Sequence, residues 1–351
     1  MIVKTQHQLS FPLLGNTRTT RLIWFLILFF SFQSWASHSV PKPEDFGFRH
    51  YTSVHKGDTS DYLVYSFKGE EQIRKPLFFM CQGSLPVPLI ITHEGKPYGT
   101  FPFNPDSLSK YYHLVIVSKP GIPLIAEDST LAPGYICRDL KTGKMPAKYS
   151  QNNYLEYYSD RNLRIISELR KMPFIDKSKI VVAGHSQGAT IAAHMASESS
   201  MITHLIYASG NPMGQIMSMI GAARKSETDS SATTSSMMKY WNDACENRND
   251  LDDEHGDTYK SVYDFSYPAI NYLRKVKIPV LVCWGTADYC TPYLDYMQVE
   301  FIRDQRRNFT FKPYVKRDHN YFGLTKEGRT DYNNFGWDIV AKDWLTWLRT
   351  K

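Results

Sequence analysis

The chain has 351 residues, of which 42% are hydrophobic and 22% are charged. These values exclude a wholly disordered chain and supply enough apolar material for one large core or two modest ones. The formal net charge is +6, and Lys4, Arg18 and Arg21 contribute three of these charges within the first 36 residues, which contain no Asp or Glu. The remaining charge of +3, with no Lys/Arg-rich block, excludes an electrostatic case for nucleic-acid binding.

The N-terminus has the three parts of a secretory signal peptide. Basic residues precede an apolar run over residues 22–30, and Ser34-Trp35-Ala36 then places small residues at the two positions that signal peptidase recognises. The run is shorter than the ~20 apolar residues that cross a bilayer. We expect residues 1–36 to be removed after Ala36, leaving residues 37–351 secreted or periplasmic without a stable membrane span. An uncleaved N-terminal anchor is the alternative.

A polar lead-in is expected from residue 37 to about residue 60. Strand-like and helix-like stretches then alternate, which predicts a mostly parallel central sheet flanked by helices. The expected strands are short apolar runs typical of strands buried on both faces, at residues 62–67, 77–80, 114–117, 179–183, 202–208, 280–284 and 309–315. Helices are expected over residues 160–171, over residues 187–195 and near the C-terminus.

Residues 211–275 interrupt this alternation, because they contain no clear strand. We interpret them as an insertion over the sheet edge that forms a partly helical cap. Its methionines either line a substrate pocket or pack as in an ordinary surface excursion. An acidic stretch follows around residues 250–257, but His255 stands where a calcium loop needs Gly. We therefore expect a solvated loop there and no metal site.

The cysteines are odd in number, so at least one thiol is expected to be free even in an exported protein. They are Cys81, Cys137, Cys245, Cys283 and Cys290. No CxxC pair occurs, and no structural zinc site is expected. Cys283 and Cys290 flank one expected strand-to-loop junction, and a disulfide between them is left open.

The most informative motif is Gly184-His185-Ser186-Gln187-Gly188. A strand-like run precedes it and an Ala-rich helical run follows it, which is the context in which Gly-x-Ser-x-Gly exposes a nucleophilic serine. A serine hydroxyl needs a base to accept its proton and a carboxylate to orient that base. We expect Ser186 to be the nucleophile. His185 is not expected to be the base, because adjacent side chains at a sharp turn point apart.

The acid and the base are expected in loops that follow later strands. Asp288 comes just after the sixth expected strand, and Asp295, in the following helix, is the alternative acid. His319 follows the last expected strand, whereas His194 and His255 occupy less suitable positions. The order Ser186, Asp288, His319 fits a nucleophile, an acid and a base arranged along one sheet edge.

Two backbone N–H groups are expected to bind the oxyanion. One belongs to Gln187, the residue after the nucleophile. The other belongs to Gly83 or Ser84, in the loop after the second expected strand. The absence of a side chain at Gly83 would let that backbone approach the substrate closely.

Three blocks, residues 181–188, residues 279–288 and Asp318-His319-Asn320, resemble the α/β-hydrolase superfamily. The resemblance extends over about residues 60–350, and within the superfamily it is to exported bacterial esterase-like and dienelactone-hydrolase-like members. It implies the α/β-hydrolase fold. It also implies hydrolysis of an ester, thioester or amide in a small-molecule acyl substrate, through an acyl-serine intermediate and without a cofactor.

Three departures from subfamily patterns leave the substrate class open. Lipases often have His-Gly where this chain has Gln82-Gly83, and prolyl-oligopeptidase-like peptidases usually have Gly where this chain has Ala189. Dienelactone hydrolases proper have Cys in place of Ser186. We expect a carboxylic-ester hydrolase. A serine peptidase of the same fold and a catalytically inactive binding module on this scaffold are the alternatives, and the complete Ser–His–Asp set argues against the second.

Overall fold

A central eight-stranded sheet dominates the structure, a computed structural model that describes residues 41–254 and 256–351. In sheet order its strands are β1 (Phe48–His55), β2 (Asp58–Tyr65), β6 (His113–Val117), β3 (Lys75–Cys81), β8 (Ile175–His185), β9 (His204–Ala208), β10 (Val280–Gly285) and β11 (Phe309–Tyr314). The six strands from β6 to β11 in this order are parallel to one another, whereas β2 runs antiparallel to both β1 and β6. The expected signal peptide, residues 1–36, lies outside the described residues.

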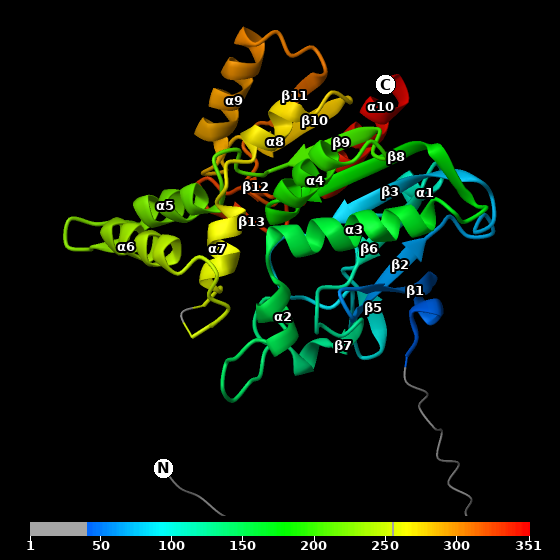
Figure 1. Cartoon of the computed structure of the whole chain (residues 1–351), viewed down its shortest axis with the longest axis horizontal. Coiled ribbons are helices and arrows are strands. Elements are labelled where there is room, and N and C mark those ends of the chain that lie inside the picture. The colour runs from blue at the N-terminus through cyan, green and yellow to red at the C-terminus, as the bar shows by residue number, and fades with distance from the viewer. Residues whose placement is uncertain (1–40, 255) are drawn as a thin grey trace, which may run out of the picture. The chain divides into compact units, whose positions relative to one another are not determined.

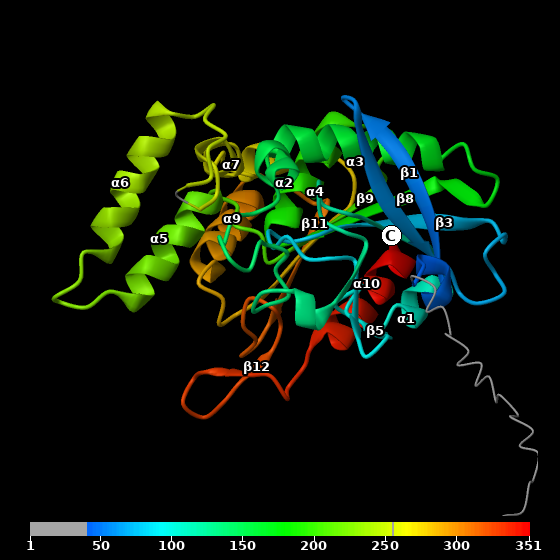
Figure 2. The ribbon, with the colours of Figure 1, turned by 90° about the horizontal axis from the view of Figure 1, so that it is seen from below.

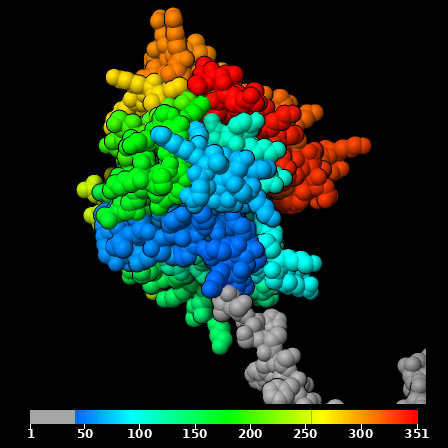
Figure 3. Space-filling model, turned by 90° about the vertical axis from the view of Figure 1, so that its right-hand side faces the viewer, coloured from blue at the N-terminus to red at the C-terminus, as the bar shows by residue number. Residues whose placement is uncertain are grey.

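All seven expected strands are present, which confirms the mostly parallel sheet. The expected polar lead-in is wrong for residues 48–60, because β1 and the start of β2 form a hairpin there. Lys56 and Gly57 turn this hairpin with φ of 49° and 83°, the left-handed values that suit a two-residue turn. The hairpin forms one edge of the sheet, and Figure 3 shows it in blue on the face turned to the viewer. In its edge strand β1 only Phe48, Ser53 and His55 are buried, so this strand lacks the continuous apolar run of the inner strands.

Helices cover both faces of the sheet (Figure 1). One face packs against α3 (Leu155–Leu169), α4 (Gln187–Glu198) and α9 (Thr291–Arg303), and the other packs against α1 (Asp106–Ser109) and α10 (Trp337–Thr350). Neighbouring residues of one strand serve the two cores: Phe79 joins the first, and Phe78 joins the second with Trp344 of α10. This two-sided burial explains the continuous apolar runs in the sequence.

Four helices occupy residues 211–275: α5 (Gln215–Ser226), α6 (Thr233–Glu246), α7 (Tyr259–Phe265) and α8 (Ile270–Lys275). No strand occurs in the described part of this range, so the partly helical character of the insertion is confirmed. Phe265 of α7 and Leu273 of α8 are buried in the core of the first face. Figures 1 and 2 show α5 and α6 side by side, on the far side of α7 from the sheet.

The remaining elements are short. A three-stranded sheet contains β4 (Ile90–His93), β5 (Lys96–Tyr98) and β7 (Ile125–Glu127), and a two-stranded sheet contains β12 (Gly323–Leu324) and β13 (Thr330–Asp331). Helix α2 spans Ala147–Asn152, and single 3-10 turns span Pro43–Phe46 and Asp128–Thr130. Among the described residues, no helix has the length and apolar character that a membrane span requires.

The five cysteines are free thiols. Cys283 packs in the core on one face of the sheet, where the Trp344 indole N–H lies 3.3 Å from its sulfur. Cys290 packs in the core on the opposite face. The disulfide that the sequence left open between them is therefore absent, because the sheet separates the two thiols.

Candidate active site

Ser186 occupies a strained turn between β8, which ends at His185, and α4, which begins at Gln187. Its backbone has φ 57° and ψ −125°, a combination that residues other than glycine rarely adopt. The flanking glycines are required by close packing. A Cβ at Gly184 would lie 2.0 Å from the Gly188 carbonyl oxygen, and one at Gly188 would lie 2.2 Å from the Cys81 carbonyl oxygen. The motif therefore holds α4 tightly against the ends of β8 and β3.

The structure brings Ser186, His319 and Asp288 together at the carboxyl ends of the parallel strands. The Ser186 hydroxyl lies 2.9 Å from Nε2 of His319, and Nδ1 of the same ring lies 2.7 Å from Oδ2 of Asp288. Asp288 lies just beyond β10 and His319 just beyond β11, so the strand order of the sheet places all three side chains at one edge. In this arrangement the imidazole can accept the serine proton while Nδ1–H donates to the carboxylate.

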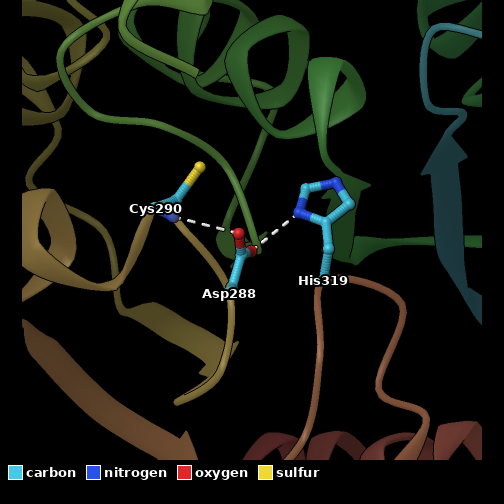
Figure 4. Close-up of side chains that lie close together, drawn as sticks. All are labelled: Asp288, Cys290 and His319. Carbon is cyan, nitrogen blue, oxygen red and sulfur yellow. Dashed lines mark hydrogen bonds and ion pairs between the residues drawn. The ribbon is translucent and has the colours of Figure 1, made fainter. Parts of the chain in front are cut away.

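The Asp288 carboxylate is fixed by a second hydrogen bond. Figure 4 shows its other oxygen accepting the backbone N–H of Cys290, at 3.0 Å, opposite the bond to His319. Asp288 is buried, so this carboxylate is shielded from water on the side away from the imidazole. The other acid and base considered from the sequence lie elsewhere: Asp295 is exposed on α9, and His194 packs on Tyr272. His255 falls outside the described residues.

His185 contacts the backbone of His319, which lies beside it in the site. Its Nε2 lies 2.9 Å from the carbonyl oxygen of His319, and its ring packs edge-on against Trp337. Burial, reinforced by the nearby His319, lowers the pKa of His185 to about 3. The neutral ring can therefore donate its Nε2–H to the His319 carbonyl, which fixes the loop that carries His319. Sequence reasoning set His185 aside as a base and missed this contact.

Tyr289 was also missed from the sequence. Its ring lies parallel to that of His319, with 5.8 Å between centroids and 11° between planes. Burial raises the pKa of Tyr289 to about 12, so the ring stays a neutral phenol at ordinary pH. Its position directly after Asp288 is the only sign of this role in the sequence. The contact leaves the His319 ring held between Tyr289, Asp288 and Ser186.

The expected oxyanion residues lie beside the nucleophile. Gln187 is the first residue of α4, where backbone N–H groups have no acceptor within the helix. β3 pairs with β8, so the loop after β3 lies next to Ser186: a Cβ at Gly83 would be 3.7 Å from the Ser186 Cβ. That distance is an ordinary contact, so the protein itself does not require glycine there. The Tyr149 hydroxyl donates to the Ser84 carbonyl oxygen at 2.8 Å and helps to fix this loop.

Two cavities open on either side of the serine. Both are lined by Ser84, Ser186, Tyr289 and His319. The larger, about 510 Å³, continues between the loop after β3 and Trp337. The smaller, about 230 Å³, continues beneath α5 and α7 of the insertion. The insertion therefore supplies part of one cavity wall, and Met219 of α5 is the methionine that contributes to it.

Two groups of potential metal ligands occur among the described residues. Asp288, Cys290 and His319 form one, and the exposed or half-buried His93, Glu127 and Asp128 form the other. In the first, Asp288 and His319 bind each other, and His319 also binds Ser186. In the acidic stretch, Asp250 and Asp252 use carboxylate oxygens to accept the N–H groups of Asp252 and Glu254.

The fold can be identified by comparison with solved structures. The chain is similar to Est1E from Butyrivibrio proteoclasticus with bound ferulic acid, at 18% identity and a TM-score of 0.53, covering 86% of this chain and 100% of that one. It is similar to a putative dipeptidyl aminopeptidase IV from Bacteroides ovatus, at 10% identity and a TM-score of 0.51, covering 79% of this chain and 33% of that one.

An acylaminoacyl peptidase from Pyrococcus horikoshii is a further match, at 16% identity and a TM-score of 0.48, covering 78% of this chain and 37% of that one. The chain thus spans about a third of the length of either peptidase. No family model matches the chain, and no curated protein matches it significantly. The chain has the α/β-hydrolase fold, which confirms the fold that the sequence resemblance implied.

Proposed function

We propose that the chain is an exported serine hydrolase that cleaves a carboxylic ester through an acyl-serine intermediate. The observation that carries the proposal is the pair of hydrogen bonds that joins Ser186 to His319 at 2.9 Å and His319 to Asp288 at 2.7 Å. The imidazole and the carboxylate are the two groups that a serine hydroxyl needs in order to act as a nucleophile near neutral pH. Their position beside two cavities leaves room for the two parts of an ester.

In the proposed first half-reaction, the Ser186 oxygen attacks the ester carbonyl carbon while His319 Nε2 takes the serine proton. Asp288 stabilises the imidazolium that forms. The backbone N–H of Gln187, with that of Gly83 or Ser84, donates to the tetrahedral oxyanion. When the carbon–oxygen bond breaks, the imidazolium protonates the departing alcohol and the acyl group stays on Ser186.

In the second half-reaction, water replaces the alcohol. His319 takes a proton from the water as its oxygen attacks the acyl-serine carbonyl carbon, and it then returns the proton to the Ser186 oxygen as the acid leaves. No step in either half-reaction calls for a metal ion or another cofactor. The reaction consumes one water and yields one carboxylic acid and one alcohol.

Export is proposed from residues 1–36 alone. N-terminal sequencing of the protein secreted from cells that express the full chain is expected to begin at Ser37. Recovery of the full-length protein in the membrane fraction would support an uncleaved anchor instead.

The catalytic proposal is tested by comparing the wild type with Ser186→Ala on short esters and on peptide amides. We expect the wild type to hydrolyse esters and the variant to lose roughly 10³-fold or more of kcat while it keeps its unfolding midpoint. Preference for peptide amides with little ester turnover would favour a serine peptidase. A folded wild type that hydrolyses neither class would favour a catalytically inactive binding module.

A further inference from the structure

We infer that the substrate is uncharged on both sides of the scissile bond and has two unlike parts, a bulky apolar group and a small group that carries a hydrogen-bond donor. The inference rests on the proposed function, because it takes Ser186 as the reacting residue. It follows from the contrast between the two cavities that meet at Ser186, Tyr289 and His319.

The larger cavity favours the apolar group. Away from the shared residues, most of its lining is hydrocarbon and aromatic, with Met80, Leu85, Val87, Ile116 and Trp337 contributing side chains. Gln82 also lines it, and its Oε1 has no hydrogen-bond partner among the described residues, but Gln82 is only half-buried. Leu85 is 52% exposed in the loop that follows β3, so covering it with an apolar ligand would remove hydrocarbon from water. At about 510 Å³, this cavity has more than twice the volume of its neighbour.

The smaller cavity favours a polar group. Thr190, Asn211, Gln215 and Ser218 line it with hydroxyl and amide groups, beside the apolar Met219, Ala222 and Phe265, over a volume of about 230 Å³. Some of these groups already bind each other, since the Asn211 amide donates to the Ser218 hydroxyl at 3.0 Å. A bulky apolar group here would separate these groups from water without replacing their hydrogen bonds.

Gln187 identifies the kind of polar group. Gln187 is 8% exposed and lines the smaller cavity, and its Oε1 is buried without a hydrogen-bond partner among the described residues. A buried amide oxygen without a partner is unfavourable, so a ligand that donates an O–H or N–H to it would be preferred over one that cannot. The group in this cavity is therefore a hydroxyl-bearing or amide-bearing group.

Neither cavity provides an ion-pair partner. Of the described residues that line the two cavities, none is Asp, Glu, Lys or Arg, and the ionisable imidazoles are His185 and His319. His185 is committed to the His319 carbonyl, and His319 to Asp288 and Ser186. A charged substrate group would lose its hydration in either cavity without gaining an opposite charge. This selects against substrates with a free carboxylate or ammonium next to the reacting bond.

A matched set of four esters, assayed with the secreted protein, tests the inference. The acyl part is phenylacetyl or glycolyl, and the alcohol part is benzyl or 2-hydroxyethyl. We expect one of the two esters that combine an aromatic part with a hydroxylated part to have the highest kcat/KM. It should exceed benzyl phenylacetate and 2-hydroxyethyl glycolate by about tenfold or more, and its identity assigns each cavity to the acyl or the alcohol side.

A fifth ester, in which a carboxylate replaces the hydroxyl of the preferred one, tests the absence of charge. We expect its kcat/KM to be lower by about a hundredfold. Equal turnover of the charged and hydroxylated esters, or benzyl phenylacetate as the best substrate, would overturn the inference.

Variants of the smaller cavity give an independent readout. Gln187→Leu removes the side-chain acceptor and keeps the backbone N–H, so the preference for the hydroxylated ester over its fully aromatic counterpart should fall about tenfold. Ser218→Ala, a change that helix α5 tolerates, should lower the same ratio by a smaller factor. Gln72→Leu makes the first exchange in an exposed turn before β3 and should leave the ratio unchanged. Unchanged ratios in both cavity variants would contradict the inference.

Ser186→Ala distinguishes a failure of the two-part substrate from a failure of the proposed function. If hydrolysis depends on Ser186 but all four esters are cleaved equally, the proposed function stands and the two-part substrate fails. If no ester is cleaved by the wild type, the proposed function itself fails and the inference falls with it.

Discussion

The turn at residues 184–188 and the insertion at residues 211–275 differ in how firmly the surrounding chain holds them. Eight of the twelve residues of α4 are buried, and the glycines before it and within it leave no space for a Cβ. In α6 only two of fourteen residues are buried. The proposed chemistry is therefore held by close-packed backbone, whereas part of the substrate cavity is built by side chains on α5, beside a loosely packed helix.

The largest expected effect comes from breaking the packing at the turn. Gly188→Ala would place a Cβ 2.2 Å from the Cys81 carbonyl oxygen and 2.4 Å from that of Gln82, so α4 must move away from the loop after β3. We expect a loss of roughly 3 kcal/mol in the free energy of unfolding, measured by urea denaturation. Gly143→Ala is the matched control, since its Cβ would meet nothing within 4 Å. Because Gly143 has a left-handed φ of 74°, alanine there should still cost about 1 kcal/mol of the free energy of unfolding. Equal losses in the two variants would contradict tight packing at the turn.

The next effect concerns the loop that carries His319. His185→Phe keeps a ring against Trp337 but removes the hydrogen bond to the His319 carbonyl. We expect kcat for an ester to fall about tenfold to a hundredfold as His319 loses its position. His185→Gln, which can still donate an N–H, should recover part of the loss. If His185→Phe and His185→Gln have the same kcat, and both variants unfold at the same urea concentration as the wild type, the hydrogen bond of His185 has no positioning role.

Stability should also depend on pH through buried histidines. Burial lowers the pKa of His185 to about 3, and burial with the nearby Lys179 lowers that of His204 to about 4. In the unfolded chain both bind protons once the pH falls below about 6.5, whereas in the folded chain they stay neutral until much lower pH. Acid therefore favours unfolding, and the stabilisation that is complete above pH ~6.5 is lost as the pH falls.

For His185 alone the slope is up to about 1.4 kcal/mol per pH unit. Urea midpoints between pH 7.5 and pH 5 should show this decline, and His185→Phe should make it shallower. A wild-type midpoint that does not move with pH would show that these histidines are not held neutral.

The smallest effect compares two methionines of the insertion. Met219 of α5 lines the smaller cavity, whereas Met238 of α6 is 48% exposed and lines neither cavity at the serine. Met219→Ala should change KM for esters by a few-fold, and Met238→Ala should change neither KM nor stability measurably. Equal kinetics for Met219→Ala and the wild type would show that Met219 does not contribute to substrate binding.

The inner strands and the turn at Ser186 could be predicted from the sequence because each is a local pattern. Strands buried on both faces appear as unbroken apolar runs, and Ser186 is marked by glycines whose absence of a Cβ the packing requires. β1 was missed because this half-exposed edge strand contains few apolar residues and buries the polar Ser53 and His55. β4, β5 and β7 are too short to form a pattern.

The rest of the site depends on contacts between distant segments. His185 meets the His319 carbonyl only because β8 and the loop after β11 end at the same edge of the sheet. Likewise, the Tyr149 hydroxyl reaches the Ser84 carbonyl from α2, sixty-five residues along the chain. The contrast between the two cavities arises from loops and helices that come from at least four separate parts of the chain. No spacing within the sequence signals these contacts, since they follow from how the sheet and the insertion pack together.

The central claim is that Ser186 is an activated nucleophile, and covalent labelling tests it most directly. Folded wild-type protein treated with a fluorophosphonate should gain the mass of one adduct, which peptide mapping should place on Ser186. Ser186→Ala should gain none, and His319→Gln should label far more slowly because its serine lacks a base. Absence of an adduct on folded wild type, or equal labelling of Ser186→Ala, would contradict the account.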